Sequence, residues 1–233
     1  MPKGPYPLVN FREPSSLETC KTMSDRDQSG FSTVNLEFVA PTSTAEPPHA
    51  RFHGNISTKL PPNRPDIARS GYAAWRTRDI GPTIFGRKYW DIDRFLFLAL
   101  QIKSDGRNYM VNVMTDTIVP TDIHQHRLHA QQPGEWETVL VRWSDFVRTS
   151  YGEPVAPQGQ MIRSRVKSVG IGLTDGVPGP FDLRINSMWA TNGEDVRGDI
   201  EENNLDEITS WERKLAKNEE SSSWGDSNLK ARL

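Results

Sequence analysis

Three histidines within six residues form the densest group of potentially reactive side chains in this chain of 233 residues. They are His124, His126 and His129. On a strand, His124 and His126 would share a face and could present two imidazoles to zinc, whereas His129 has the opposite parity. No cysteine lies nearby, and a third ligand would have to come from another segment. The pattern therefore favours a polar sheet surface, with a metal-dependent hydrolase built on His124 and His126 as a lesser hypothesis. We expect no metal or cofactor.

The other reactive residue types have ordinary explanations. Cys20 has no histidine beside it that could act as a base, and no serine lies in a nucleophile elbow. Four aspartates border predicted strands or loops, where a pair could hydrolyse glycosides, but Asp is also common in turns. They are Asp91, Asp93, Asp175 and Asp182. The glycines of Gly170–Gly176 lack the spacing of a nucleotide loop, and inside a strand they permit close packing. The sequence predicts no catalytic residue.

The elements that would position these side chains are strands, and the most informative one is Arg94–Ile102. Phe95, Phe97 and Ala99 point one way, and Leu96, Leu98, Leu100 and Ile102 point the other way. A strand that is apolar on both faces must be covered on both sides, so it lies centrally in a packed sheet. Asp105-Gly106 can supply the positive backbone angles of a two-residue turn, which predicts Tyr109–Thr115 as its hairpin partner.

Further strands are predicted along the chain, with almost no helix between them. They are Thr33–Val39, Arg51–Ser57, Gly71–Arg78, Ile118–Ala130, Trp136–Trp143, Val166–Thr174 and Phe181–Ala190. The last strand alternates strictly, which is typical of an antiparallel strand with one wet face. Its apolar face consists of Phe181, Leu183, Ile185, Ser187 and Trp189. The gaps hold too many prolines and glycines for helical crossovers, so the sequence predicts an all-β fold, an antiparallel β-sandwich or jelly roll.

The N-terminal region suggests a short helix. Ser15-x-x-Glu18 has the form of a capping box, which predicts a helix reaching about Met23, although chance in a serine-rich loop explains so short a motif equally well. The preceding residues are spaced by prolines and are expected to be extended. Their proline content also disfavours a signal or amphipathic presequence.

After Gly193 the composition changes. A stripe of apolar residues recurs at helical spacing and predicts an amphipathic helix over 204–218, which docks on its own domain or on another protein. The stripe consists of Leu205, Ile208, Trp211 and Leu215. The sequence thus predicts three regions: an N-terminal extension, a β-sandwich domain and an acidic tail. Their bounds are 1–23, 24–192 and 193–233.

Charge and cysteine content narrow the classes of protein. Residues 193–233 hold 11 Asp/Glu against 6 Lys/Arg, and residues 1–192 hold 19 against 22. This modest asymmetry does not argue for nucleic acid. A single cysteine excludes an internal disulfide and fits a reducing or matrix-like compartment. No stretch approaches the ~20 apolar residues of a membrane helix.

Several separated motifs together resemble the complex I intermediate-associated protein family. They are Ser24-Asp25 with Gly30–Ser32; Phe52–Ile56; Ser70–Thr77; Asp91; Ser104–Arg107 with Tyr109; Gly134–Trp136 with Trp143–Phe146; Lys167–Gly172; and Gly179–Ile185. Together the motifs span about residues 24–192, and their order and spacing make the set specific. One departure is the run Asp27–Gly30, where the family usually has a glycine pair.

The resemblance implies a galactose-binding-like jelly roll and a mitochondrial, matrix-facing assembly factor for NADH:ubiquinone oxidoreductase. Such proteins hold partly built membrane-arm intermediates together with other assembly factors, and they reach the inner membrane through these partners. They are not known for an active site. We therefore expect a non-enzymatic chaperone that works through protein contacts and binds no nucleic acid. The candidate partner-binding residues are Leu205, Ile208, Trp211 and Leu215.

A carbohydrate-binding module is the second hypothesis, because the same sandwich often holds sugars. The chain is rich in aromatic residues that could stack on sugar rings, although such residues more often fill a core. They are Trp75, Tyr89, Trp90, Tyr109, Trp136, Trp143 and Trp189. This hypothesis requires exposed, coplanar tryptophans on one concave face.

Overall fold

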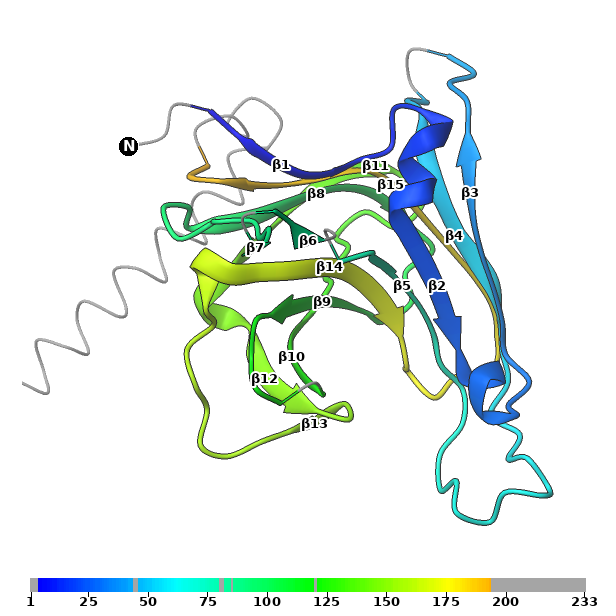
Figure 1. Cartoon of the computed structure of the whole chain (residues 1–233). Coiled ribbons are helices and arrows are strands. Elements are labelled where there is room, and N and C mark those ends of the chain that lie inside the picture. The colour runs from blue at the N-terminus through cyan, green and yellow to red at the C-terminus, as the bar shows by residue number, and fades with distance from the viewer. Residues whose placement is uncertain (1–3, 44–45, 80–81, 85, 120, 194–233) are drawn as a thin grey trace, which may run out of the picture. The chain divides into compact units, whose positions relative to one another are not determined.

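The computed structural model describes residues 4–43, 46–79, 82–84, 86–119 and 121–193, whose strands form two antiparallel sheets (Figure 1). Sheet A has the order β11-β8-β15-β4-β3, and β1 also pairs with β15; sheet B has the order β13-β12-β10-β9-β14-β5-β2. The inner faces of the two sheets enclose one hydrophobic core. The fold is the antiparallel β-sandwich that the sequence predicts. The predicted helix over 204–218 lies outside the described residues.

The strands match most of the predicted segments. Sheet A contains β1 (Tyr6–Asn10), β3 (Thr33–Val39), β4 (His49–Ile56), β8 (Phe97–Ser104), β11 (Trp136–Arg142) and β15 (Gly179–Thr191). Sheet B contains β2 (Cys20–Ser24), β5 (Ala73–Thr77), β9 (Tyr109–Thr115), β10 (Asp122–Arg127), β12 (Val147–Ser150), β13 (Glu153–Pro154) and β14 (Val166–Leu173). A separate small hairpin joins β6 (Pro82–Thr83) to β7 (Gly86–Arg87). The helices of the described residues are short 3-10 turns: η1 (Pro14–Thr19), η2 (Asp25–Gln28), η3 (Trp143–Asp145) and η4 (Arg163–Arg165).

Strand β8 is an inner strand of sheet A and is covered by the core, as its apolar sequence predicts. It pairs with β11 on one side and with β15 on the other. Leu98, Leu100 and Ile102 are fully buried against sheet B. Leu96 differs from the expectation, because it is 60% exposed. The ladder begins only at Phe97, so Leu96 lies beyond the end of the covered sheet.

The predicted hairpin of β8 and β9 does not form. β8 belongs to sheet A, whereas β9 pairs with β10 and β14 in sheet B. Gly106 has the positive φ that the motif predicts, but the segment 105–108 carries the chain from one sheet to the other. The hairpin is wrong because Leu98–Ile102 and Tyr109–Val113 both turn apolar side chains into the core, and facing layers bury these side chains better than one sheet would.

Strand β15 departs from strict alternation at a bulge between Ile185 and Ser187. Residues before the bulge keep the predicted face, with Phe181, Leu183 and Ile185 in the core. After the bulge the inward positions are Met188 and Ala190, so Ser187 and Trp189 do not share the buried face of Ile185. The extra residue also changes the partner of β15, which pairs with β4 before the bulge and with β1 after it.

The N-terminal helix is shorter than predicted. It ends at Thr19, and its cap position is Glu13, which makes no side-chain capping bond, so the capping-box interpretation of Ser15 is wrong. Residues 20–24 form β2, which pairs with β5 at the edge of sheet B. The ladder to β5 gives these residues hydrogen-bond partners and buries Cys20. The interaction with a neighbouring strand thus outweighs a local helical signal.

The buried position of Leu100 on β8 predicts a large effect of truncation there. Leu100→Ala should lower the free energy of unfolding by about 2–5 kcal/mol, because it leaves a cavity between two well-packed sheets. Leu96→Ala, four residues away on an exposed side chain, is the matched control and should change it by less than about 0.5 kcal/mol. Urea unfolding of both variants measures the difference, and equal losses would contradict the assignment of β8 to the core.

Candidate functional site

The histidines of β10 face the core. His124 and His126 share a face, as predicted, and their cross-strand partners are Val113 and Val111, which belong to the hydrophobic core. His124 is 3% exposed. The interpretation of this segment as a polar outer surface is therefore wrong. Alternation along the strand correctly placed both histidines on one face, but it could not decide which of the two faces is covered.

These imidazoles do not form a metal centre. Among the described residues, no group of three His, Cys, Asp or Glu side chains is placed to hold a metal ion. Burial lowers the pKa of both His124 and His126, and the charge of Arg148 lowers that of His124 further. Their Nδ1 atoms have no hydrogen-bond partner in the structure. Burial thus favours the neutral form of both side chains, of which His124 is buried and His126 is half-buried.

The four candidate aspartates serve the architecture. Asp175 pairs with Arg107 at 2.7 Å, and Asp182 pairs with Arg51 at 2.6 Å. The other two lie together in a turn, where Oδ1 of Asp91 accepts a hydrogen bond from the backbone N–H of Asp93. Asp93 also lies 3.4 Å from Arg163. These contacts account for the aspartates without any acid–base chemistry.

One group of family motifs converges on Asp25, whose side chain is almost fully buried. Its Oδ1 accepts a hydrogen bond from the N–H of Ser32 at 2.9 Å, and its Oδ2 accepts bonds from Ser32 Oγ, Ser70 Oγ and Gly71 N–H at 2.7–2.9 Å. Burial alone raises the pKa of this carboxyl, but the hydrogen bonds outweigh that effect and lower the pKa below its ordinary value. A Cβ on Gly30 would lie 2.4 Å from Asp25 Cγ, so this position requires glycine.

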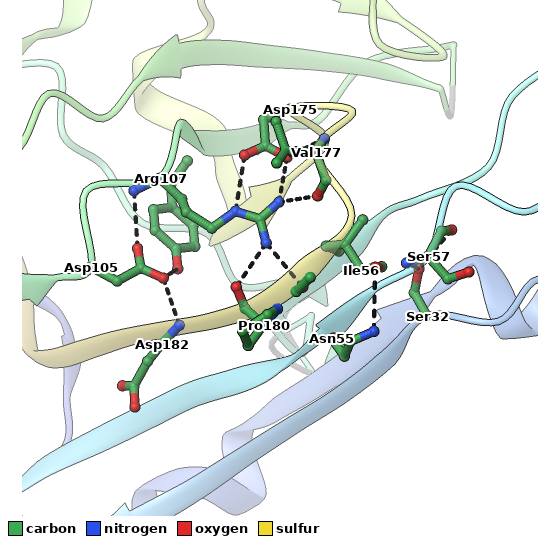
Figure 2. Close-up of polar contacts among 12 residues, drawn as sticks. Ser32, Asn55, Ile56, Ser57, Asp105, Arg107, Asp175, Val177, Pro180 and Asp182 are labelled. Atoms are coloured by element: carbon green, nitrogen blue, oxygen red, sulfur yellow. Dashed lines mark hydrogen bonds and ion pairs between the residues drawn. The ribbon is translucent and has the colours of Figure 1, made fainter.

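A second group of motifs converges on Arg107 (Figure 2). Its guanidinium donates two hydrogen bonds to Asp175, at 2.7 and 3.0 Å, which is the bidentate geometry of a strong ion pair. It also donates to the backbone carbonyls of Val177, Gly179 and Pro180. The side chains of Arg107 and Asp175 are only 13% and 4% exposed. The pair therefore fixes the segment 105–108 to the β14–β15 connection.

Asp105 completes this network. Its Oδ2 accepts hydrogen bonds from the N–H of Asp182 at 2.8 Å and from the hydroxyl of Tyr109 at 3.2 Å. Burial and the charge of Asp105 raise the pKa of Tyr109, so that its hydroxyl stays protonated and donates. Figure 2 shows Ser32, Asn55 and Ser57 beside this network, and Ser32 Oγ accepts from the N–H of Ser57 at 3.0 Å. We call the part of the sandwich that holds segments 25–32, 58–71, 105–108 and 174–179 the crossover end.

The described tryptophans do not provide a sugar platform. Trp75 and Trp143 are buried in the core, and the other three described tryptophans are half-buried. These three are Trp90, Trp136 and Trp189. The condition set by the carbohydrate hypothesis, a row of exposed coplanar tryptophans, is not met by the described part of the chain.

Sequence reasoning missed the two buried centres, Asp25 and Arg107. Each belongs to a family motif, but neither stood out as a site, because isolated charged residues are usually exposed. The available signal was the pattern of small or hydroxyl residues around Asp25 (Gly30, Ser32, Ser70). Such residues donate hydrogen bonds at close range. A pattern of this kind indicates a buried carboxylate only if the segments meet in space.

The fold and these centres define a class: a β-sandwich of galactose-binding-like type, whose internal charges hold its connections in place. Solved carbohydrate-binding modules share this fold. A family 11 module from Clostridium thermocellum is 14% identical, covers 82% of this chain and 97% of its own, and gives a TM-score of 0.55. At this identity the likeness concerns the fold alone.

The particular family follows from the sequence. The family described as Complex I intermediate-associated protein 30 (CIA30) matches residues 9–185, and the chain belongs to this family. A protein of Neurospora crassa named "Complex I intermediate-associated protein 30, mitochondrial" is 46% identical over 215 residues, which are 85% of this chain and 77% of that protein. The mouse protein of the same name is 29% identical over 76% of this chain. The chain spans only 53% of the mouse protein's length.

The buried ion pair predicts a large loss of stability on truncation. Arg107→Met should lower the free energy of unfolding by about 3–5 kcal/mol, because it leaves the Asp175 carboxylate buried without its partner. Arg64→Met is the control, since Arg64 also makes a bidentate pair, with Asp66, but on the exposed surface. It should change stability little. Equal effects in chemical denaturation would show that the crossover contact is not a structural centre.

His124 and His126 predict a loss of stability in mild acid. Their folded pKa values lie below the ordinary 6.5, so the unfolded chain takes up protons first as the pH falls. Stability should be full above about pH 6.5 and should decrease below it. The double variant His124→Gln/His126→Gln should lose most of this decrease, and His129→Gln, which leaves both imidazoles in place, should keep it. Urea unfolding at about pH 7 and pH 5 tests this, and an unchanged pH dependence in the double variant would contradict it.

Proposed function

We propose that this protein is a non-enzymatic assembly factor for mitochondrial respiratory complex I. The observation that carries the proposal is the family match over residues 9–185, which spans nearly the whole described sandwich. The names of the relatives support both the complex I role and a mitochondrial location. The candidate aspartates and histidines serve the fold, as their ion pairs and burial indicate, and this supports a role in binding.

The partners in this proposal are membrane-arm intermediates of complex I and other assembly factors, met at the matrix side of the inner membrane. Among the described residues no helix is long and apolar enough to cross a bilayer. A rigid sandwich can cover apolar or edge surface on a half-built complex until the next subunit arrives, and its binding stabilises the intermediate by mass action. The proposed division of labour assigns one contact to the sandwich, to which β1 and β2 also contribute strands, and a second contact to the tail.

The second contact is the predicted apolar stripe of the tail, which lies outside the described residues. Its members are Leu205, Ile208, Trp211 and Leu215. Their spacing predicts one apolar face on an amphipathic helix, the form in which many partner grooves bind peptides. We propose these residues as partner-binding residues.

Deletion of the gene tests the assembly role. Mitochondria of the deletion strain should accumulate a membrane-arm intermediate on native gels and should lack mature complex I, and reintroduction of the gene should restore it. A gene that carries Ile208→Asp/Trp211→Asp should restore assembly less well than the unmodified gene, because two charges interrupt the apolar stripe of the tail. Normal complex I in the deletion strain would overturn the proposal.

A further inference from the structure

Five exposed apolar side chains lie at the end of the sandwich where β8 and β14 begin, opposite the crossover end. This apolar rim consists of Tyr6, Leu96, Ile118, Val119 and Ile162. Ile118 is 100% exposed and Leu96 is 60% exposed. At the crossover end the large exposed apolar residues of the described chain are Phe31, Leu60 and Val177. Ile84, Val147 and Tyr151 are the other large exposed apolar residues of the described chain, so the rim holds five of the eleven, the largest single group.

The loops that carry Leu96 and Ile162 are joined to each other. Nη1 of Arg163 donates a hydrogen bond to the carbonyl of Phe95 at 3.1 Å. The ring of Tyr6 stacks on that of Phe95, with centroids 5.9 Å apart. These contacts bring three members of the rim, from three separate segments of the chain, into one neighbourhood.

The loop of Ile118 and Val119 adjoins the same end. The N–H of Asp116 donates to the carbonyl of Arg165 at 3.0 Å, which connects the loop after β9 to η4. The hydroxyls of Thr121 and Ser150 are 2.9 Å apart, which connects that loop to the β12–β13 turn. In Figure 1 the end of β9 and the start of β14 lie together at the left of the molecule. The rim is thus a set of side chains on loops that are fastened together.

Positive charge accompanies the rim. The segments 87–94, 116–119 and 162–167 contain six Lys or Arg against three Asp. At the crossover end, segments 25–32, 58–71, 105–108 and 174–179 contain five Lys or Arg and five Asp, which balance. Aromatic residues lie among the cations, since Arg165 stacks over the ring of Tyr89 at 5.1 Å and Trp90 beside it is half-buried. The rim end therefore combines apolar tips, aromatic rings and surplus positive charge.

This combination suits a bilayer surface better than a protein groove. Apolar side chains on separate loop tips can enter the acyl boundary, while lysines and arginines between them meet lipid phosphates. Tyrosine and tryptophan are favoured at the interface because one part of the ring is apolar and the other polar. We propose that the apolar rim binds directly to a lipid bilayer with anionic headgroups. This inference goes beyond the assembly role and does not depend on it.

Vesicle binding tests the proposal with the full chain. It should cosediment with vesicles of phosphatidylcholine mixed with phosphatidylglycerol, and less with phosphatidylcholine alone. Raised salt should weaken the binding, because it screens the cations of the rim. The double variant Leu96→Asp/Ile118→Asp should bind at least about tenfold more weakly, since two apolar tips no longer enter the membrane.

A matched control keeps the result interpretable. Phe31→Asp/Val177→Asp places the same two charges on exposed apolar residues of the crossover end and should bind like the unmodified protein. All four positions are solvent-exposed, so urea unfolding should show that both double variants remain folded. Equal loss of binding in both variants, or no binding of the unmodified chain to anionic vesicles, would overturn the proposal.

Site-specific labelling supplies a second readout. Cys20 is the only cysteine and is buried, so a cysteine introduced at Ile118 can be labelled alone. An environment-sensitive fluorophore on Ile118→Cys should shift to the blue on anionic vesicles, and the same label on Val177→Cys should not. A shift at Val177 alone would assign membrane contact to the other end. If the shift required a partner protein rather than vesicles, the rim would be a protein-binding surface and the proposal would be wrong.

Discussion

The guanidinium group of Arg107 holds together two of the connections through which the chain passes between the sheets at the crossover end. It lies on the connection from β8 to β9 and binds the connection from β14 to β15 through Asp175 and three backbone carbonyls. Without Arg107 the buried carboxylate of Asp175 would lack a counter-charge. Because β8, β9, β14 and β15 are all inner strands of their sheets, this contact joins connections that lead directly into the core.

Asp25 has a corresponding role for the segments around β2, β3 and β5. It gathers donors from Ser32, Ser70 and Gly71, which come from loops far apart in sequence. Both centres use residues of the family motifs. The family motifs therefore mark the loops that these buried polar contacts hold in place. Surfaces that contact partners need not carry these motifs, because exposed contacts tolerate more variation than a buried charge does.

Charged residues and exposed apolar residues are also distributed unevenly between the two ends of the sandwich. The crossover end is balanced in charge and rigidly cross-linked, whereas the opposite end carries apolar tips and surplus cations. The proposed role as an assembly factor beside a membrane makes use of both properties. The rigid end preserves the shape of the sandwich, and exposed loops at the other end can make contacts without disturbing the core.

The sequence by itself determined the class of fold and the family. Alternation and apolar runs located β3, β8, β14 and much of β15, because burial of one face leaves a period of two that needs no partner to be recognised. The same reasoning could not assign strands to sheets. Asp105-Gly106 has the chemistry of a hairpin turn, yet β8 and β9 lie in different sheets. Their apolar side chains are better buried when the two strands face each other across the core than when they pair in one sheet.

Tertiary structure alone decided which face of each strand is covered. The sequence predicts His124 and His126 on a polar surface, but they face the core. Ser187 and Trp189 lie on the face opposite to the predicted one, because the bulge after Ile185 reverses the alternation of every later residue of β15. It also brought Arg107 to Asp175, 68 residues away, and left Leu96 exposed just beyond the ladder. Parity along a strand is a local property, whereas covering a face or pairing a charge depends on segments that only the folded chain brings together.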